Sequence, residues 1–199
     1  LFIMKKRISI LGSTGSIGVN ALKVIRNLSE SYEIVNLSGN MNADLMIQQC
    51  EKFQPKSIVM INEEASEKVQ KALINNDVEV LSGRDNLLRI SKEKNVDLVL
   101  NALVGSSGME PTLEALMAGV DVALSNKESL VVAGDLITSS MKNSGANLFP
   151  VDSEHSAIWQ CMVGESVNDI EKIILTGSGG PFRKRSIDSF SKITVSDAL

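Results

Sequence analysis

The sequence is short of histidine, cysteine and aromatic residues, and these shortages exclude several kinds of protein. Its 199 residues include one histidine, two cysteines and only 4% aromatic residues. Cys50 and Cys161 lie far apart, so they form neither a Cys-X-X-Cys redox motif nor, with a single histidine, a zinc-binding cluster. Both cysteines instead fit a reducing compartment, where they serve as small buried apolar residues.

An excess of positive charge and a long apolar run are also absent. The chain has 20 Lys and Arg residues against 24 Asp and Glu residues, which gives a net charge of −4. We therefore expect neither a nucleic acid nor an anionic membrane surface as a partner. No apolar run reaches the roughly 20 residues that a membrane-spanning helix requires.

The sequence does contain apolar, strand-like runs that alternate with helical patterns. Val, Ile and Leu dominate these runs, and short turns separate them from the helices. This alternation predicts an α/β protein with a Rossmann-like, doubly wound, mostly parallel sheet that helices cover on both faces. The expected strands are 8–11, 33–37, 57–61, 78–81, 96–103, 120–124 and 170–175, and the expected helices are 19–28, 43–53, 63–75, 85–94 and 111–118.

A glycine-rich turn follows the first apolar run. Gly12, Gly15 and Gly18 give the spacing G-x-x-G-x-x-G between an expected strand and an expected helix. This is a variant of the dinucleotide-binding fingerprint, in which the backbone approaches a pyrophosphate at a helix N-terminus. Thr14 and Ser16 add hydroxyl groups to the turn. A plain strand-to-helix turn without a ligand is the alternative.

The end of the second expected strand bears on the choice of cofactor. NAD-binding folds place an Asp or Glu there to hold the ribose 2′-hydroxyl, and residues 36–42 contain no carboxylate. Its absence permits the 2′-phosphate of NADP, to which Ser38 and Asn42 could donate hydrogen bonds. Alternatively, Asn42 only caps the following helix.

Three later segments also place polar groups after expected strands. Lys127 and Glu128 could touch a ligand, or they are solvated charges at a helix start. Asp152 and Glu154 offer oxygen ligands to a hard divalent cation and could converge if the backbone is extended, unless Asp152 or Ser153 only caps a helix over 156–163. Ser178 lies in a glycine-rich segment that forms either an anion-binding nest or an ordinary turn.

Taken together, four motifs resemble those of the 1-deoxy-D-xylulose 5-phosphate reductoisomerase family. They are GSTGSIG at 12–18, NKESLV at 126–131, VDSEHS at 151–156 and TGSGGPFR at 176–183, and the resemblance covers essentially the whole chain. It implies an enzyme that makes 2-C-methyl-D-erythritol 4-phosphate for isoprenoid biosynthesis with NADPH and Mg²⁺ or Mn²⁺. It also implies a homodimer in the bacterial cytoplasm or in plastids, without a nucleic-acid or membrane partner.

The resemblance assigns roles residue by residue. It implies that Lys127 and Glu154 are catalytic, and that Asp152 and Glu154 bind the metal. Substrate contacts are implied for Lys127, Ser153, Glu154 and Ser178. Cofactor contacts are implied for Thr14, Gly15, Ser16, Ile17, Asn42, Asn126 and Glu128.

By the same resemblance, residues 1–150 form the NADP-binding domain and residues 151–199 begin an α+β catalytic domain. The family continues beyond the point that corresponds to Leu199, so we expect this chain to be about half of the enzyme and inactive alone. Met41 departs from the pattern, because the family often has a basic or small polar residue in this turn.

Two other functions are compatible with the glycine turn. Another NADP-dependent oxidoreductase, such as a semialdehyde dehydrogenase, would need a catalytic cysteine, and both cysteines fall in helical patterns. A dinucleotide-binding module without catalysis would not need the acidic pair Asp152 and Glu154.

Overall fold

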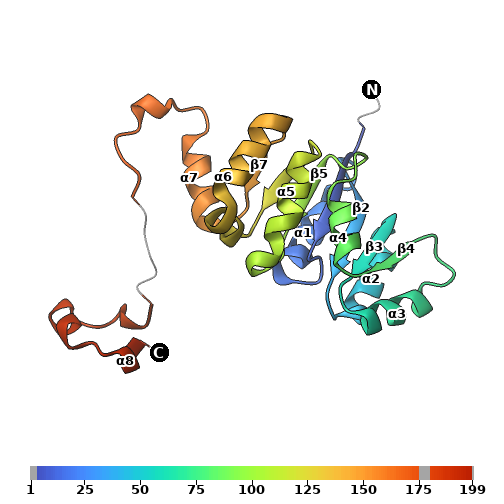
Figure 1. The fold of residues 1–199 in the computed structure, drawn as a ribbon, viewed down its shortest axis with the longest axis horizontal. Helices are drawn as coiled ribbons and strands as arrows, with labels where there is room; N and C mark the ends of the chain where they lie inside the picture. Colours follow the sequence, from blue (N-terminus) through green and yellow to red (C-terminus); the bar gives the residue numbers. More distant parts are fainter. Residues whose placement is uncertain (1–3, 175–179, 199) are drawn as a thin grey trace. The chain divides into compact units, whose positions relative to one another are not determined.

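The computed structural model describes residues 4–174 and 180–198 (Figure 1). The chain divides into two compact units, Leu1–Gln160 and Cys161–Leu199. The first unit contains a seven-stranded, all-parallel sheet, which confirms the expected Rossmann-like α/β fold. Its strands are β1 (Lys6–Leu11), β2 (Tyr32–Gly39), β3 (Ser57–Met60), β4 (Glu79–Ser82), β5 (Leu98–Asn101), β6 (Asp121–Leu124) and β7 (Leu148–Pro150).

Helices connect these strands as the alternating pattern predicts, and one more helix, α7, follows the last strand. They are α1 (Ser16–Asn27), α2 (Ala43–Phe53), α3 (Glu63–Ala72), α4 (Arg84–Ser91), α5 (Met109–Met117), α6 (Lys127–Ser144) and α7 (Ser153–Met162), with a short 3₁₀ helix, η1 (Gly105–Gly108), before α5. α6 is kinked at Ala133, whose φ of −134° and ψ of 28° are not helical.

The strand order indicates at which point of the sheet a ligand is expected to bind. The order is β4-β3-β2-β1-β5-β6-β7, so the chain builds outward from β1 to β4 and then returns past β1 to β5. This reversal between β1 and β5 is the topological switch point, outside which doubly wound sheets bind their ligands. The turns that follow β1 and β5 are therefore neighbours at the carboxyl edge of the sheet.

Two apolar clusters hold the helices against the sheet. One face packs Ile8 and Ile10 of β1 against side chains of α1, α2 and α3, such as Leu22, Met46 and Val69. The other face packs Leu11 of the same strand against side chains of α4, α5 and α6. Side chains of a strand alternate between faces, so one short apolar strand supplies both clusters.

The second unit corrects one expectation. Residues 170–174 are not a β-strand, although the apolar run at 170–175 predicts one. A strand needs a hydrogen-bonded neighbour, and the described residues from Cys161 onward form only the C-terminal end of α7 and other short helical elements. These are η2 (Val167–Asp169), η3 (Gly180–Phe182), η4 (Ile187–Lys192) and α8 (Val195–Ala198).

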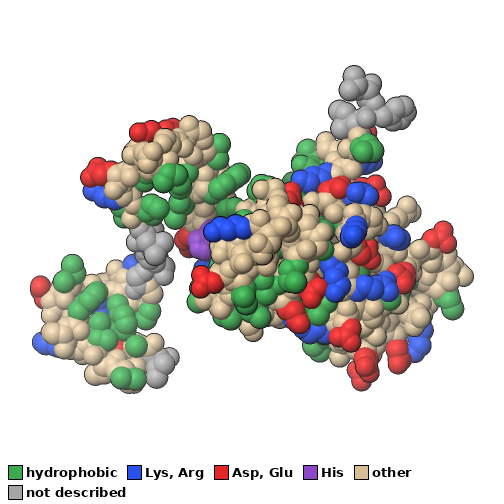
Figure 2. Space-filling model, turned by 45° about the horizontal axis from the view of Figure 1, so that its top comes forward, with side chains coloured by type: hydrophobic (Ala, Val, Ile, Leu, Met, Phe, Trp, Pro, Cys, Tyr) green, Lys and Arg blue, Asp and Glu red, His purple; other side chains and the backbone are tan. Residues whose placement is uncertain are grey.

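The surface fits the charge balance of the sequence. Acidic and basic side chains are interspersed over the face of the first unit that Figure 2 shows. Among the described helices, none combines the length and the apolar character needed to cross a membrane. The compact first unit ends at Gln160 rather than at residue 150, and the functional division of the chain at 150 remains a prediction.

Candidate functional site

A cleft of about 380 Å³ opens at the carboxyl edge of the sheet. Its lining contains no carboxylate and one basic side chain, that of Arg84. The wall combines apolar side chains with the backbone of glycine-containing turns, which suits a flat heterocycle joined to phosphates. The lining residues are Gly12, Thr14, Gly15, Gly39, Asn40, Ile61, Arg84, Leu87, Ala102, Leu103, Val104 and Ser107.

Each outer glycine of the turn is required by a close backbone contact. Gly12 has a φ of +82°, and a Cβ atom there would lie 2.8 Å from the carbonyl oxygen of Ala102. A Cβ atom at Gly18 would lie 2.4 Å from the carbonyl oxygen of Gly12. Only glycine fits at either position, because real Cβ atoms do not approach so closely. The turn therefore stays tight against β5, beside the cleft.

The N-terminus of α1 presents backbone donors at the same place. Gly15 is the N-cap of α1 and provides no side-chain hydrogen bond, while the amide of Val19 is bonded to the carbonyl oxygen of Gly15. The first amides of the helix, including those of Ser16 and Ile17, therefore lack partners within the helix. Such amides, at the positive end of the helix dipole, bind anionic groups such as a pyrophosphate.

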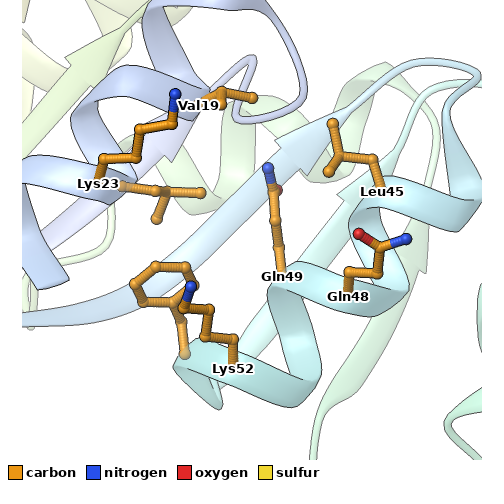
Figure 3. Close-up of a pocket in the computed structure, with 8 residues that line it drawn as sticks. Val19, Lys23, Leu45, Gln48, Gln49 and Lys52 are labelled. Carbon is orange, nitrogen blue, oxygen red and sulfur yellow. The ribbon is translucent and has the colours of Figure 1, made fainter.

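Two buried side chains, those of Gln49 and Ser38, form hydrogen bonds to the glycine turn and fix its conformation. The Ser13 hydroxyl lies 2.7 Å from Gln49 Oε1, and Gln49 Nε2 donates to the Ser13 carbonyl oxygen at 2.9 Å. Figure 3 shows Gln49 projecting from α2 into the space between α1 and α2. The Gly12 amide donates to Ser38 Oγ at 3.1 Å. The sequence analysis missed Gln49, because no local pattern links it to a turn 36 residues earlier.

The turn after β2 differs from the expectation at one residue. Ser38 is only 1% exposed and holds the glycine turn, so it does not reach a cofactor phosphate in this arrangement. Asn42 caps α2, with its Oδ1 accepting from the amide of Leu45 at 3.1 Å. A cofactor contact of Asn42 remains a prediction. Met41 is 72% exposed.

Arg84, the first residue of α4, is a cleft residue that the sequence analysis did not identify. Its guanidinium bonds to Glu110 at 2.8 Å and to the carbonyl oxygen of Ser107 at 3.4 Å. The side chain thus runs from α4 to η1 and the start of α5 along the cleft wall. An arginine at a helix start carries no motif, so only the fold could identify it.

Asn126 precedes the two charged residues expected to contact a ligand. It is the N-cap of α6 and accepts from the amide of Ser129 at 2.9 Å, and the exposed residues Lys127 and Glu128 begin the helix. Asn126 Nδ2 also donates to the carbonyl oxygens of Leu103 and Gly105, in the loop that lines the cleft. The cofactor contacts of Asn126 and Glu128 remain predictions.

Lys127 and Asp152 form an ion pair, although Lys127 follows β6 and Asp152 follows β7. Lys127 Nζ is 3.4 Å from Asp152 Oδ2, and the Asp152 side chain is 13% exposed. The bond to Asp152 raises the pKa of Lys127. Burial raises the pKa of Asp152, but hydrogen bonding and the nearby Lys127 cation lower it by more. Both groups are therefore charged at neutral pH.

The backbone of the acidic pair, Asp152 and Glu154, is not extended as the sequence analysis expected. The backbone from Ser153 onward is helical, so the carboxylates do not converge along an extended segment. Asp152 instead precedes α7, and Glu154 lies in its first turn and accepts from Ser153 Oγ at 3.0 Å. The alternation of side chains along a strand therefore does not apply here.

The acidic pair has one property expected of a cation site. Asp152 Oδ1 is buried and has no hydrogen-bond partner. A buried carboxylate oxygen without a partner is costly, and a divalent cation would satisfy it. No group of three or more His, Cys, Asp or Glu side chains suited to a metal occurs within residues 4–174 and 180–198. Asp152 and Glu154 thus fit part of a magnesium or manganese ligand set.

Ser178, expected near a substrate phosphate, lies outside the described residues. The described residues bring together two groups of predicted site residues. Thr14, Gly15, Ser16 and Ile17 lie at or beside the cleft, and Lys127 lies beside the acidic pair.

Comparisons with known proteins point to one family. The sequence profile described as "1-deoxy-D-xylulose 5-phosphate reductoisomerase" matches residues 8–134, and the profile of its C-terminal domain matches residues 148–199. A reductoisomerase of this name from Chloroherpeton thalassium is 48% identical over 98% of this chain and 50% of its own length. The chain therefore spans about half the length of such curated relatives.

Solved structures agree with the sequence matches. The reductoisomerase from Zymomonas mobilis in complex with NADPH superposes with a TM-score of 0.88 at 34% identity, over 98% of this chain and 52% of that one. A DOX-P reductoisomerase in complex with NADPH, fosmidomycin and magnesium superposes with a TM-score of 0.83 at 35% identity, over 98% of this chain and 50% of that one.

Proposed function

The chain belongs to the 1-deoxy-D-xylulose 5-phosphate reductoisomerase family, and from this we propose that it forms the cofactor-binding part and the first metal ligands of such an enzyme. The complete enzyme isomerises and reduces 1-deoxy-D-xylulose 5-phosphate to 2-C-methyl-D-erythritol 4-phosphate with NADPH. One observation carries the proposal: the glycine-turn cleft and the Lys127–Asp152 pair, with its unpartnered oxygen, follow strands of one parallel sheet.

The cleft supports a phosphorylated dinucleotide. Backbone amides at the start of α1 would bind the pyrophosphate, and the absence of a carboxylate from the lining favours NADPH over NADH. Leu103 would provide an apolar wall beside the nicotinamide. NADPH, when bound, supplies the hydride.

The acidic pair supports a divalent cation. Asp152 and Glu154 would hold it, with the unpartnered Asp152 Oδ1 as one ligand. When bound, the cation supplies Lewis acidity toward oxygen atoms of the substrate. Lys127 lies 3.4 Å from Asp152 Oδ2, where its charge would stabilise an oxyanion of the substrate.

The experiment uses the complete protein that carries this sequence. We expect turnover of the sugar phosphate with NADPH and Mg²⁺, and an at least tenfold higher Mg²⁺ requirement for Asp152→Asn or Glu154→Gln. Asp135→Asn, on the exposed part of α6, is the matched control and should leave the requirement unchanged. Absence of turnover by the unmodified protein would overturn the function, and an unchanged Mg²⁺ requirement would remove that residue from the ligand set.

A cysteine-dependent dehydrogenase is the competing function. Such an enzyme needs a thiolate with a lowered pKa. Burial instead raises the pKa of the Cys50 thiol to about 12, which keeps it protonated and inert. Cys161 lies in α7 and is exposed, so the expected burial of both cysteines is wrong for this one. A non-catalytic dinucleotide-binding module would need no cation, and the buried Asp152 Oδ1 would then remain without a partner.

We also propose the finer properties that the resemblance implies. The complete protein would form a homodimer, accept Mn²⁺ as well as Mg²⁺, and reside in the bacterial cytoplasm or in a plastid, without a nucleic-acid or membrane partner. A net charge of −4 and two unpaired cysteines support a reducing compartment. Light scattering after gel filtration, metal substitution and cell fractionation test these points.

A further inference from the structure

The peptide group between Ser13 and Thr14, in the glycine turn, is hydrogen-bonded at one end only. The Ser13 carbonyl oxygen accepts from Gln49 Nε2 at 2.9 Å. Within the part of the chain that the structure describes, the Thr14 amide has no hydrogen-bond partner. Thr14 lines the cleft, whereas Gln49 lies on α2 and lines a separate groove between α1 and α2 (Figure 3).

The bond at one end of this peptide group fixes the direction of the other end. The peptide bond is trans, and the carbonyl and the N–H of a planar trans peptide point in opposite directions. Gln49 holds the Ser13 carbonyl toward α2. The Thr14 N–H therefore points away from α2.

Gln49 is itself held in one orientation. The residue is 5% exposed, and its Oε1 accepts from the Ser13 hydroxyl at 2.7 Å. Because a carbonyl oxygen only accepts, the Gln49 amide nitrogen must face the Ser13 carbonyl. The other side of Ser13 is also closed, since a Cβ atom at Gly18 of α1 would lie 2.5 Å from Ser13 Cα. Ser13 is fully buried, and its amide donates to the Ser38 carbonyl oxygen at 2.8 Å.

We propose that Gln49 is a positioning residue that aims the Thr14 N–H into the cleft as a donor to the cofactor pyrophosphate. The proposal rests on the proposed function. Donors that are fixed in place before an anion binds need no reorganisation when it arrives. Without the Gln49 amide, the peptide group is free to rotate and to present the Ser13 carbonyl oxygen to the cleft, where it would repel a phosphate.

Two substitutions at Gln49 remove the donor in different ways. Gln49→Met keeps the length and the apolar part of the side chain but loses both hydrogen bonds to Ser13. Gln49→Glu keeps an acceptor for the Ser13 hydroxyl, but when ionised it sets a carboxylate oxygen against the Ser13 carbonyl. Gln48→Met is the matched control, because Gln48 is the exposed neighbour on α2 that lines the same groove. Among the described residues it makes no hydrogen bond to the turn.

Two ligands of the complete protein distinguish positioning from general damage to the cleft. For Gln49→Met and Gln49→Glu we expect the Kd for NADPH, measured by calorimetry, to rise about tenfold. Adenosine 2′-monophosphate contains no pyrophosphate, so its Kd, measured by NMR titration, should change less than about threefold. Gln48→Met should change neither value. Unchanged NADPH affinity in Gln49→Met would overturn the proposal. An equal loss for both ligands would show that the whole cleft had deformed and would also overturn it.

A crystal structure of the complete Gln49→Met protein tests the peptide group without any cofactor. We expect the Ser13 carbonyl to turn away from α2, with the rest of the sheet unchanged. A Ser13–Thr14 peptide that kept its orientation would overturn the proposal. If the unmodified protein does not bind NADPH, the cofactor part of the proposed function fails, and this structure still decides whether Gln49 sets the direction of the Thr14 N–H.

Discussion

At the turn after β2, one exposed side chain bears on cofactor choice. Met41 is 72% exposed beside Asn40, which lines the cleft, and it cannot pair with a 2′-phosphate. Ser38 is buried against the glycine turn. Of the two neutral donors expected for the 2′-phosphate, Ser38 and Asn42, only Asn42 therefore remains. Affinity for NADPH at this end of the cleft therefore depends on few polar groups.

We predict that Met41→Arg tightens NADPH binding about tenfold, which corresponds to roughly 1.4 kcal/mol. The guanidinium would form a charged, bidentate pair with the phosphate, and added salt should weaken the gain. Titration of NADPH and NADH at two ionic strengths measures it.

Two controls make the Met41 prediction specific. NADH lacks the phosphate and should bind unchanged. Met117→Arg adds the same charge at the C-terminal end of α5, on an exposed methionine that does not line the cleft, and should have no effect. Equal tightening of both cofactors would mean that residue 41 acts through packing instead.

At the scale of elements, the helices differ in how their first backbone amides are satisfied. Helices α2, α3 and α6 begin after Asn42, Asn62 and Asn126, whose side chains cap them. Helix α1 begins after Gly15 without a side-chain cap. An uncapped start leaves amides free, and glycine lets a ligand approach them. Helices α4 and α5 also begin after glycines, Gly83 and Gly108, without a side-chain cap. The place of α1 directly after β1, at the switch point of the sheet, is what supports the proposal that α1 binds the phosphates.

The pairing of β1 with β5, which brings the glycine turn to the cleft loop, is reinforced at its other end. Asp97, just before β5, accepts from the Arg7 amide at 2.8 Å and from its guanidinium at 2.8 Å. The bond to Arg7 lowers the pKa of Asp97 below its ordinary value, despite partial burial. Both side chains are about two-fifths exposed, so solvent screens the pair.

This lowered pKa fixes the sign of a pH dependence. A carboxyl with a lower pKa in the folded state stabilises above its unfolded pKa of about 3.9, and the stabilisation is lost as pH falls through the folded value. We therefore predict that Asp97→Asn lowers the Tm at pH 7 and that the difference shrinks below about pH 4. Thermal unfolding followed by circular dichroism measures both values.

The matched control is Asp44→Asn, which removes an ion pair to Lys68 whose side chains are 72% and 56% exposed. It should leave the Tm nearly unchanged at every pH, because exposed pairs contribute little. A Tm difference for Asp97→Asn that persisted undiminished at low pH would assign the effect to packing instead of charge.

At the scale of the molecule, the two halves of the site differ in how much of them the described residues contain. The cleft is lined entirely by residues of one compact unit. The described residues supply two carboxylates to the proposed cation site, whereas magnesium prefers near-octahedral coordination. Cofactor binding and turnover should therefore be separable.

We predict that the 199-residue chain alone binds NADPH, more weakly than the complete protein, and does not turn over the sugar phosphate. Calorimetry with NADPH and an absorbance assay of NADPH oxidation test the two parts. Gly15→Asp is the control for binding, since it places a carboxylate at the N-cap of α1 and should abolish it. Robust turnover by the 199-residue chain would contradict the prediction.

The sequence alone determined the features that depend on neighbouring residues. The alternation of apolar runs with helical patterns fixed the parallel sheet, and Gly12, Gly15 and Gly18 identified the turn. The two acidic residues after an apolar run also predicted Asp152 and Glu154 as candidate ligands of a divalent cation. The sequence did not predict the helical backbone on which Glu154 lies. Local sequence carries these signals because strand alternation, tight turns and caps involve residues only a few positions apart.

Only the tertiary structure decided which distant residues meet. Gln49 lies 36 residues from Ser13, Arg84 lies 26 from Glu110, and Lys127 lies 25 from Asp152. The strand order places these residues together, and a local sequence pattern does not encode pairings between residues that are separated by whole helices and strands. The expectation for Ser38 was wrong for the same reason. The pairing of β1 with β2 buries Ser38 against the glycine turn, where it bonds to Gly12 and not to a cofactor.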